Sequence, residues 1–137
     1  RHGERPLLML AGGTGLAPLL SMLETLQAQN AARPVTLMYG VTRDADLVKT
    51  EALEAFRQQL THFRWLPVVA DENSPCPQRG FVTDHVNDAM LNNGEVDIYL
   101  CGPPPMVNAV ATALRERGIT PAGFWYEKFI ASQSAAA

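Results

Sequence analysis

Two glycine-rich segments near opposite ends of the chain have the composition of phosphate-binding turns: AGGTGLAP at residues 11–18 and LCGPPPM at residues 100–106. Each follows a short apolar run typical of a buried strand and precedes the pattern of a helix. In such turns glycine lets a phosphate approach the backbone N–H groups closely, and proline in the first helical turn removes an N–H that lacks a partner. Together the segments predict a site where one nucleotide contacts both turns.

Neither turn matches a named fingerprint on its own. Pro18 stands where the dinucleotide-binding fingerprint has its third glycine, and no Gly-Lys-Ser/Thr follows as a P-loop requires. A tight strand-to-helix turn without a ligand is therefore an open alternative for the first segment. For Cys101, in the second segment, the alternative is a small buried hydrophobic residue.

The elements that must position these turns alternate between strand and helix. Apolar runs predict strands at residues 7–11, 35–41, 63–69, 96–101 and 123–127. A helix is expected after each of the first four strands; Thr50 is the expected N-cap of the second, and Gly118 ends the last. The third helix is expected to be short and to carry Val82, Val86 and Met90.

This alternation predicts the α/β class, a five-stranded parallel sheet with helices on both faces in a Rossmann-like nucleotide-binding domain. In such sheets ligands bind beyond the carboxyl ends of the strands, where the strand order reverses. Three segments are expected: a linker from a missing upstream domain at 1–6, a nucleotide-binding domain at 7–131 and a disordered tail at 132–137.

Composition narrows the function classes. With 137 residues, a net charge of −3 and no charge blocks, the chain lacks the basic stripe of a nucleic-acid surface. Its apolar run at 7–11 is too short for a membrane span or a signal peptide, so a cytoplasmic location without membrane contact is expected. Only Cys76 and Cys101 are present, without CxxC spacing, so no metal site is expected and any iron–sulfur cluster must lie elsewhere.

Five motifs, in order, resemble the nucleotide-binding domain of the ferredoxin–NADP reductase superfamily. They are GGTGLAP at 12–18, YGV at 39–41 with Asp46-Leu47 beyond, GFVTD at 80–84, YLCGPPPM at 99–106 and EKF at 127–129. Within the superfamily, the chain is most similar to the reductase components of aromatic-ring dioxygenases of the benzoate 1,2-dioxygenase type.

The resemblance implies that NADH passes a hydride to FAD, which passes electrons singly to an iron–sulfur centre. FAD would be bound mainly by a barrel domain, whose arginine-x-tyrosine-serine/threonine motif does not occur here. The implied partners are that FAD-binding barrel and a terminal oxygenase. Whether a ferredoxin domain with a 2Fe-2S cluster belongs to the same polypeptide is left open. The isolated chain is expected to bind no FAD and to be inactive as a reductase.

The resemblance and the chemistry of the turns together assign the site residues. Cys101 would sit near the transferring carbon, Glu127 would orient the site or relay a proton, and Phe129 would stack on the flavin. The alternative for Phe129 is a cap on the hydrophobic edge of the sheet. Catalytic roles fall to Thr14, Cys101, Glu127 and Phe129. Cofactor binding is assigned to Gly12, Gly13, Thr14, Gly15, Pro18, Gly40, Val41, Arg43, Asp71, Cys101, Gly102, Pro103, Pro104 and Met106.

Selectivity for NADH is expected from Ala70 and Asp71, because NADPH-using relatives place serine and arginine there to hold the 2′-phosphate. A carboxylate accepts a hydrogen bond from a ribose hydroxyl but repels a phosphate, by about 4 kcal/mol at ~4 Å and an effective dielectric constant of ~20. Two alternatives stay open: Arg43 could fold over the ribose, and Asp71 could merely begin the loop at 71–80.

Two other functions fit parts of the pattern. A free flavin or ferric reductase of the same superfamily would differ in its partner domain. A non-catalytic nucleotide-sensing module or receiver-like domain would need neither Cys101 nor Glu127. Receiver chemistry also needs an acidic cluster at the end of the first strand, where Ala-Gly-Gly stands at residues 11–13.

Overall fold

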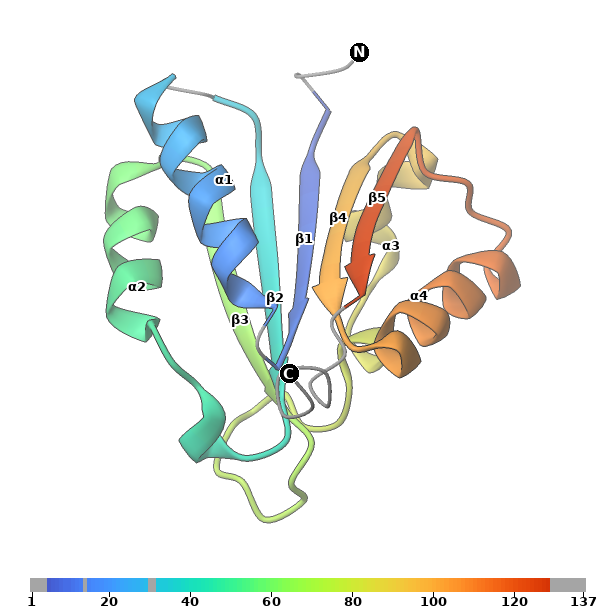
Figure 1. Ribbon diagram of the computed structural model, residues 1–137. Helices are drawn as coiled ribbons and strands as arrows, with labels where there is room; N and C mark the ends of the chain where they lie inside the picture. Colours follow the sequence, from blue (N-terminus) through green and yellow to red (C-terminus); the bar gives the residue numbers. More distant parts are fainter. Residues whose placement is uncertain (1–4, 14, 30–31, 129–137) are drawn as a thin grey trace, which may run out of the picture.

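A computed structural model describes residues 5–13, 15–29 and 32–128 of the chain as one parallel sheet with helices packed on it (Figure 1). The sheet has the strand order β3-β2-β1-β4-β5, and every neighbouring pair is parallel. The strands are β1 (Leu7–Gly12), β2 (Val35–Val41), β3 (Phe63–Val69), β4 (Asp97–Gly102) and β5 (Gly123–Lys128). Strand order reverses after β3, because β4 pairs with the other edge of β1.

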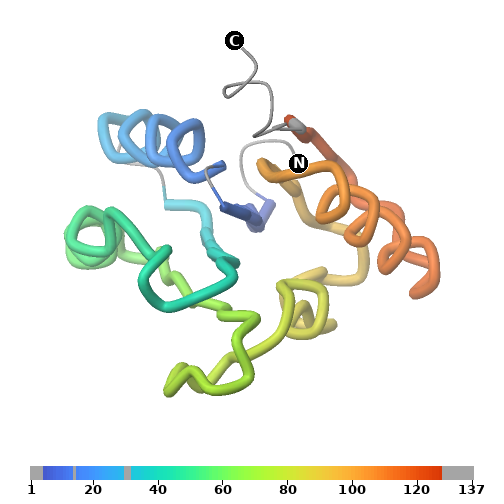
Figure 2. Tube along the Cα trace, turned by 60° about the horizontal axis from the view of Figure 1, so that its bottom comes forward, coloured from blue at the N-terminus to red at the C-terminus, as the bar shows by residue number. Residues whose placement is uncertain are grey.

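Helices cover both faces of the sheet, as Figure 2 shows from the carboxyl ends of the strands. The helices α1 (Leu16–Ala28) and α2 (Thr50–Gln59) pack on one face, and α3 (Asp88–Leu91) and α4 (Pro104–Glu116) on the other. Each layer of helices encloses its own apolar cluster, so all six residues of β1 are buried. Burial on both faces explains why β1 reads as a continuous apolar run rather than an alternating one. The expected α/β fold is confirmed.

The third helix differs from the expectation. Instead of one helix through Val82, Val86 and Met90, the chain forms a 3-10 turn, η2 (Val82–Asp84), and then the separate α3. The side chain of Asn87 accepts a hydrogen bond from the N–H of Met90 at 2.9 Å, and this N-cap starts a new helix. Two further 3-10 turns are η1 (Asp44–Asp46) and η3 (Asn92–Gly94).

Other element ends shift by one residue. Thr50 was the expected N-cap of the second helix, but Lys49 occupies that position in a left-handed conformation, with φ 59° and ψ 22°. Thr50 is therefore the first helical residue. Strand β4 begins and ends one residue later than expected, so it extends to Gly102.

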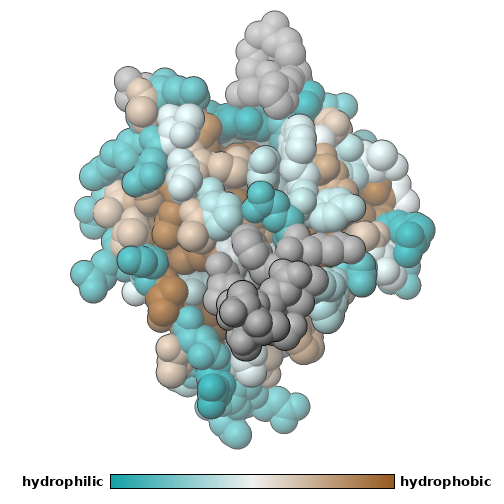
Figure 3. Space-filling view, viewed as in Figure 1, coloured by the Kyte–Doolittle hydropathy of each residue, from teal (hydrophilic) through white to brown (hydrophobic). Residues whose placement is uncertain are grey.

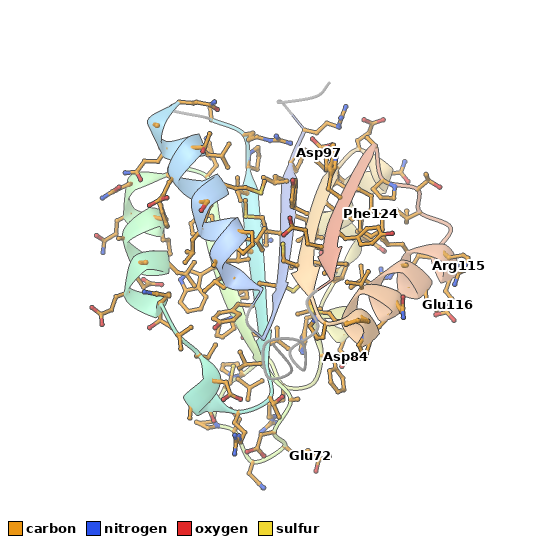
Figure 4. The ribbon with its side chains drawn as sticks, in the orientation of Figure 1. Glu72, Asp84, Asp97, Arg115, Glu116 and Phe124 are labelled. Carbon is orange, nitrogen blue, oxygen red and sulfur yellow. The ribbon has the colours of Figure 1, made fainter. Side chains whose placement is uncertain are left out.

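An ion-pair cluster closes the amino end of the sheet, where Figure 4 labels Asp97. The carboxylate of Asp97 is 1% exposed and lies 3.0 Å from Nη2 of Arg5 and 2.7 Å from Nη2 of Arg33. The N–H of Asp97 donates to the carbonyl of Pro6 at 3.0 Å. Arg5 and Pro6 fall in the expected linker, yet both are tied to the sheet. The expected tail at 132–137 lies outside the described residues.

None of the helices within the described ranges is long and apolar enough to cross a membrane.

Candidate nucleotide-binding site

The two glycine-rich turns meet where the strand order reverses, at the adjacent carboxyl ends of β1 and β4. Ala11 pairs with Cys101 in the sheet, so Gly12 and Gly102 follow side by side. A Cβ added to Gly102 would lie 3.5 Å from the backbone nitrogen of Gly12. Two turns whose paired residues, Ala11 and Cys101, are 90 residues apart in the chain thus form one edge, at the position where open α/β sheets bind ligands.

Close packing accounts for several glycines at this edge. A Cβ on Gly15 would overlap the carbonyl of Cys101, so α1 can begin against the end of β4 only with glycine there. The thioether of Met106 covers both Gly12 and Gly102, because a Cβ on either would collide with its Sδ. Met106 therefore holds the two turns together from the α4 side.

The backbone donors of the first turn are partly used inside the protein. The N–H of Gly13 donates to the carbonyl of Gly40 at 3.1 Å, and the N–H of Gly15 donates to that of Gly12 at 2.9 Å. Thr14 lies outside the described residues. The donors facing an anion are therefore expected in the first turn of α1, whose initial N–H groups have no partner within the helix. No acidic residue occupies that turn, and Pro18 is its third residue.

Gly40 and Val41, at the end of β2, accept hydrogen bonds from the segments that follow β1 and β3. Gly40 accepts from Gly13, and a Cβ on Gly40 would lie 2.9 Å from a methyl group of Val82 in η2. Val41 accepts from the N–H of Ala70 at 2.9 Å. On β4, Pro103 is the N-cap of α4 and Pro104 its first residue, which is the expected arrangement for a proline-led helix.

Cys101 and Glu127 form a pair across β4 and β5. They are register partners, and the thiol donates to Oε2 of Glu127 across 3.9 Å. Cys101 is fully buried, and burial, followed by the nearby Glu127 carboxylate, raises its pKa to about 11. The thiol therefore stays neutral at physiological pH and is not a thiolate nucleophile. Phe129, the expected flavin-stacking residue, lies outside the described residues.

The residues expected to read the adenosine ribose lie beyond β2 and β3. Arg43 is 72% exposed and its Nε lies 3.9 Å from Asp46 Oδ2, so it pairs within its own loop. Oδ1 of Asp71 accepts from the N–H of Asn73 at 3.0 Å, an Asx turn that opens the loop. Asp71 is half-buried in the loop that follows β3, and its hydrogen bond within the turn does not exclude a second role towards a ribose.

Among the described residues, no group of three or more His, Cys, Asp and Glu side chains is arranged to hold a metal ion.

Comparison with known proteins identifies the family. Residues 9–112 match the model of a family described as the oxidoreductase NAD-binding domain. The chain belongs to this family. The chain is thus an oxidoreductase domain of the ferredoxin–NADP reductase superfamily, as the motifs predicted. Membership of this family favours an enzymatic function over a nucleotide-sensing module.

The chain is similar to parts of longer proteins. It is 54% identical, over 96% of its length, to the toluate 1,2-dioxygenase electron transfer component of Pseudomonas putida. It is 47% identical, over 94%, to the 2-halobenzoate 1,2-dioxygenase electron transfer component of Burkholderia cepacia. The chain spans 39% of the length of each. The crystal structure of the Amycolatopsis cytochrome P450 reductase GcoB superposes with a TM-score of 0.81 at 35% identity, covering 94% of this chain and 38% of that one.

Sequence reasoning missed the hydroxyl groups of Tyr39 and Ser74 and the Asp97 cluster. Tyr39 belongs to the YGV motif at 39–41, so its place in the second strand could be predicted, but the hydrogen-bond partners of its hydroxyl could not. Ser74 lies in a loop rich in turn formers, where serine is ordinary.

Proposed function

We propose that this domain is the NADH-binding part of a flavin-dependent reductase that supplies electrons to an aromatic-ring dioxygenase. The observation that carries the proposal is the meeting of both glycine-rich turns at the β1–β4 edge, with Cys101 and Glu127 beside them. The relatives' names as dioxygenase electron transfer components support the choice of oxygenase. An FAD-binding barrel, an iron–sulfur centre and the terminal oxygenase are the proposed partners.

The residues present fit a dinucleotide. Within the described part of the chain nothing lies within 4 Å of a Cβ added to Gly13, so the described residues leave the outer side of the first turn open to a ligand. The start of α1 carries no acid and presents the positive end of the helix dipole to a pyrophosphate. With the pyrophosphate there, the nicotinamide would lie towards Cys101 and Glu127, and the adenosine towards β2 and β3.

Bound NADH supplies a hydride, and FAD accepts it and releases electrons singly. The part of this chain is to bind and orient. Cys101 supplies a neutral, buried side chain at the end of β4, and Glu127 orients the thiol by accepting a hydrogen bond from it. Thr14 and Phe129 keep their proposed roles at the nicotinamide and the flavin.

A glutamate at the start of α1 tests the binding site. Ala17 is the second residue of α1 and is exposed. Ala17→Glu is expected to weaken NADH binding about tenfold by charge repulsion, while the helix gains rather than loses stability from an acid in its first turn. Isothermal titration of the chain with NADH and with ADP-ribose measures the affinity, and thermal melting checks the fold.

The matched control is Ser21→Glu, which adds the same charge one turn further along the exposed side of α1. It should leave the affinity near that of the unmodified chain. Equal weakening by both substitutions would indicate a general charge effect and remove the pyrophosphate from the α1 N-terminus.

Cofactor selectivity is tested in the complete reductase. Replacing Ala70 by Ser and Asp71 by Arg should raise kcat/KM for NADPH relative to NADH by tenfold or more, which corresponds to about 1.4 kcal/mol. Asp71→Asn is the control for the Asx turn, since its amide oxygen still accepts from Asn73. An unchanged ratio in the double variant would place the selectivity determinant at Arg43 or elsewhere.

A further inference from the structure

The loops that follow β2 and β3 are joined by a buried hydroxyl. Ser74 is only 3% exposed although it lies in a surface loop. Its Oγ donates to Oδ1 of Asp44, in η1, at 2.7 Å, and accepts from the N–H of Cys76 at 3.0 Å. One side chain therefore fixes its own loop and links it to the loop of the neighbouring strand, 30 residues away.

A second hydroxyl fixes η1 from the sheet. Tyr39 has no exposed surface, and its OH donates to the carbonyl of Asp46 at 3.3 Å and accepts from the N–H of Val48 at 3.2 Å. The phenol ring belongs to the core cluster under α1 and α2. The segment at 44–48 is thus attached to a residue that is itself immobilised by packing.

Backbone bonds extend the β2–β3 pairing into both loops. The N–H of Ala70 donates to Val41 and that of Asp71 to Thr42, both at 2.9 Å, and the N–H of Ser74 donates to Asp71 at 3.1 Å. In Figure 1 the two loops lie side by side below the sheet, and the same region is mostly hydrophilic in Figure 3. Glu72, labelled in Figure 4, marks its outer tip.

We propose that Tyr39 and Ser74 are positioning residues for the adenosine half of the bound nucleotide, because they hold segments 44–48 and 71–76 as one preformed wall. The inference rests on the proposed function, which puts the adenosine over β2 and β3. A wall that is already ordered spares the cost of ordering loop residues when the ligand binds. Neither residue needs to touch the ligand.

The test is isothermal titration of the chain with ADP-ribose, which carries the adenosine and both phosphates but no nicotinamide. Tyr39→Phe, Ser74→Ala and Asp44→Ala are each expected to raise the dissociation constant about three- to tenfold. Asp44→Asn keeps an oxygen acceptor for Ser74 and should stay within about twofold of the unmodified chain. Thr36→Val is a second control. It removes a hydroxyl that accepts a hydrogen bond from Arg64 at the amino end of β2, the strand that carries Tyr39, and it should leave the ADP-ribose affinity unchanged.

Amide hydrogen exchange at Val48 shows whether the contact was broken, because its N–H loses the Tyr39 hydroxyl in Tyr39→Phe. Faster exchange at Val48 with unchanged ADP-ribose affinity would overturn the inference. Equal weakening by Asp44→Asn and Asp44→Ala would also overturn it, because charge rather than the hydrogen bond would then matter. If the unmodified chain bound neither NADH nor ADP-ribose, the proposed function itself would fail, and this inference with it.

Discussion

Gly15→Ala is expected to lower the melting temperature by about 10 °C, through a loss of about 3 kcal/mol in the free energy of unfolding. The φ of Gly15 is −77°, which alanine adopts freely, so the effect comes from space alone. The new Cβ would overlap the carbonyl oxygen of Cys101 and lie 2.6 Å from its carbon, and both are backbone atoms that cannot rotate away. Relief requires α1 to move off the end of β4.

This displacement should also weaken NADH binding about tenfold or more, because the start of α1 and the second glycine-rich turn would no longer share one edge. Circular dichroism melting and isothermal titration with NADH measure the two effects. Gly118→Ala is the control: its φ is 70° and no described residue lies within 4 Å of the added Cβ. It should cost about 1–2 kcal/mol from the left-handed conformation alone and leave NADH affinity unchanged. A Gly15→Ala variant no less stable than Gly118→Ala would contradict the steric argument.

Asp97→Asn should destabilise the domain by about 3 kcal/mol at pH 7, because it leaves two guanidinium groups without their common counter-charge. Arg5 and Arg33 are 16% and 11% exposed, so water screens them poorly. Arg33 also donates through Nε to the carbonyl of Arg5 at 2.8 Å, which holds the cluster together when the carboxylate is present. Urea unfolding of the unmodified chain and of Asp97→Asn gives the difference in their free energies of unfolding.

The pH dependence of this difference has a definite sign. Burial alone would raise the pKa of Asp97, but hydrogen bonds from Arg33 and Arg5 outweigh it and hold the pKa below 3.8. A carboxyl whose pKa is lowered on folding contributes stability above its unfolded pKa and loses it as pH falls through the folded value. The difference in free energy of unfolding between the unmodified chain and Asp97→Asn should therefore have its full size above about pH 4 and become smaller below it.

Asp88→Asn is the matched control, because Asp88 is 98% exposed and pairs with Arg117 on the surface. Its effect should stay below about 1 kcal/mol at any pH. A gap for Asp97→Asn that grew as the pH fell towards 3 would show that the carboxyl is protonated in the native state, contrary to the ion-pair geometry.

Local features made most of the architecture predictable from sequence. Apolar runs located every strand to within a residue at each end, and the glycine-proline turns marked the ends of β1 and β4. The third helix was predicted wrongly because a side chain decides where it starts: Asn87 caps a new helix and divides the expected one in two. Asparagine in a helical pattern gives only a weak signal, since the same residue is common in turns.

The sequence alone determined the α/β class, the five strands and the presence of two glycine-rich turns at strand ends, because apolar periodicity and glycine or proline placement act over a few residues. Its motifs also determined the family. Only the tertiary structure decided which distant groups meet: Cys101 with Glu127, Arg5 and Arg33 with Asp97, and Ser74 with Asp44. These partners are 26, 92, 64 and 30 residues apart in the chain. Strand order and register bring them into contact, and both follow from burying two faces of one sheet at once rather than from any local pattern.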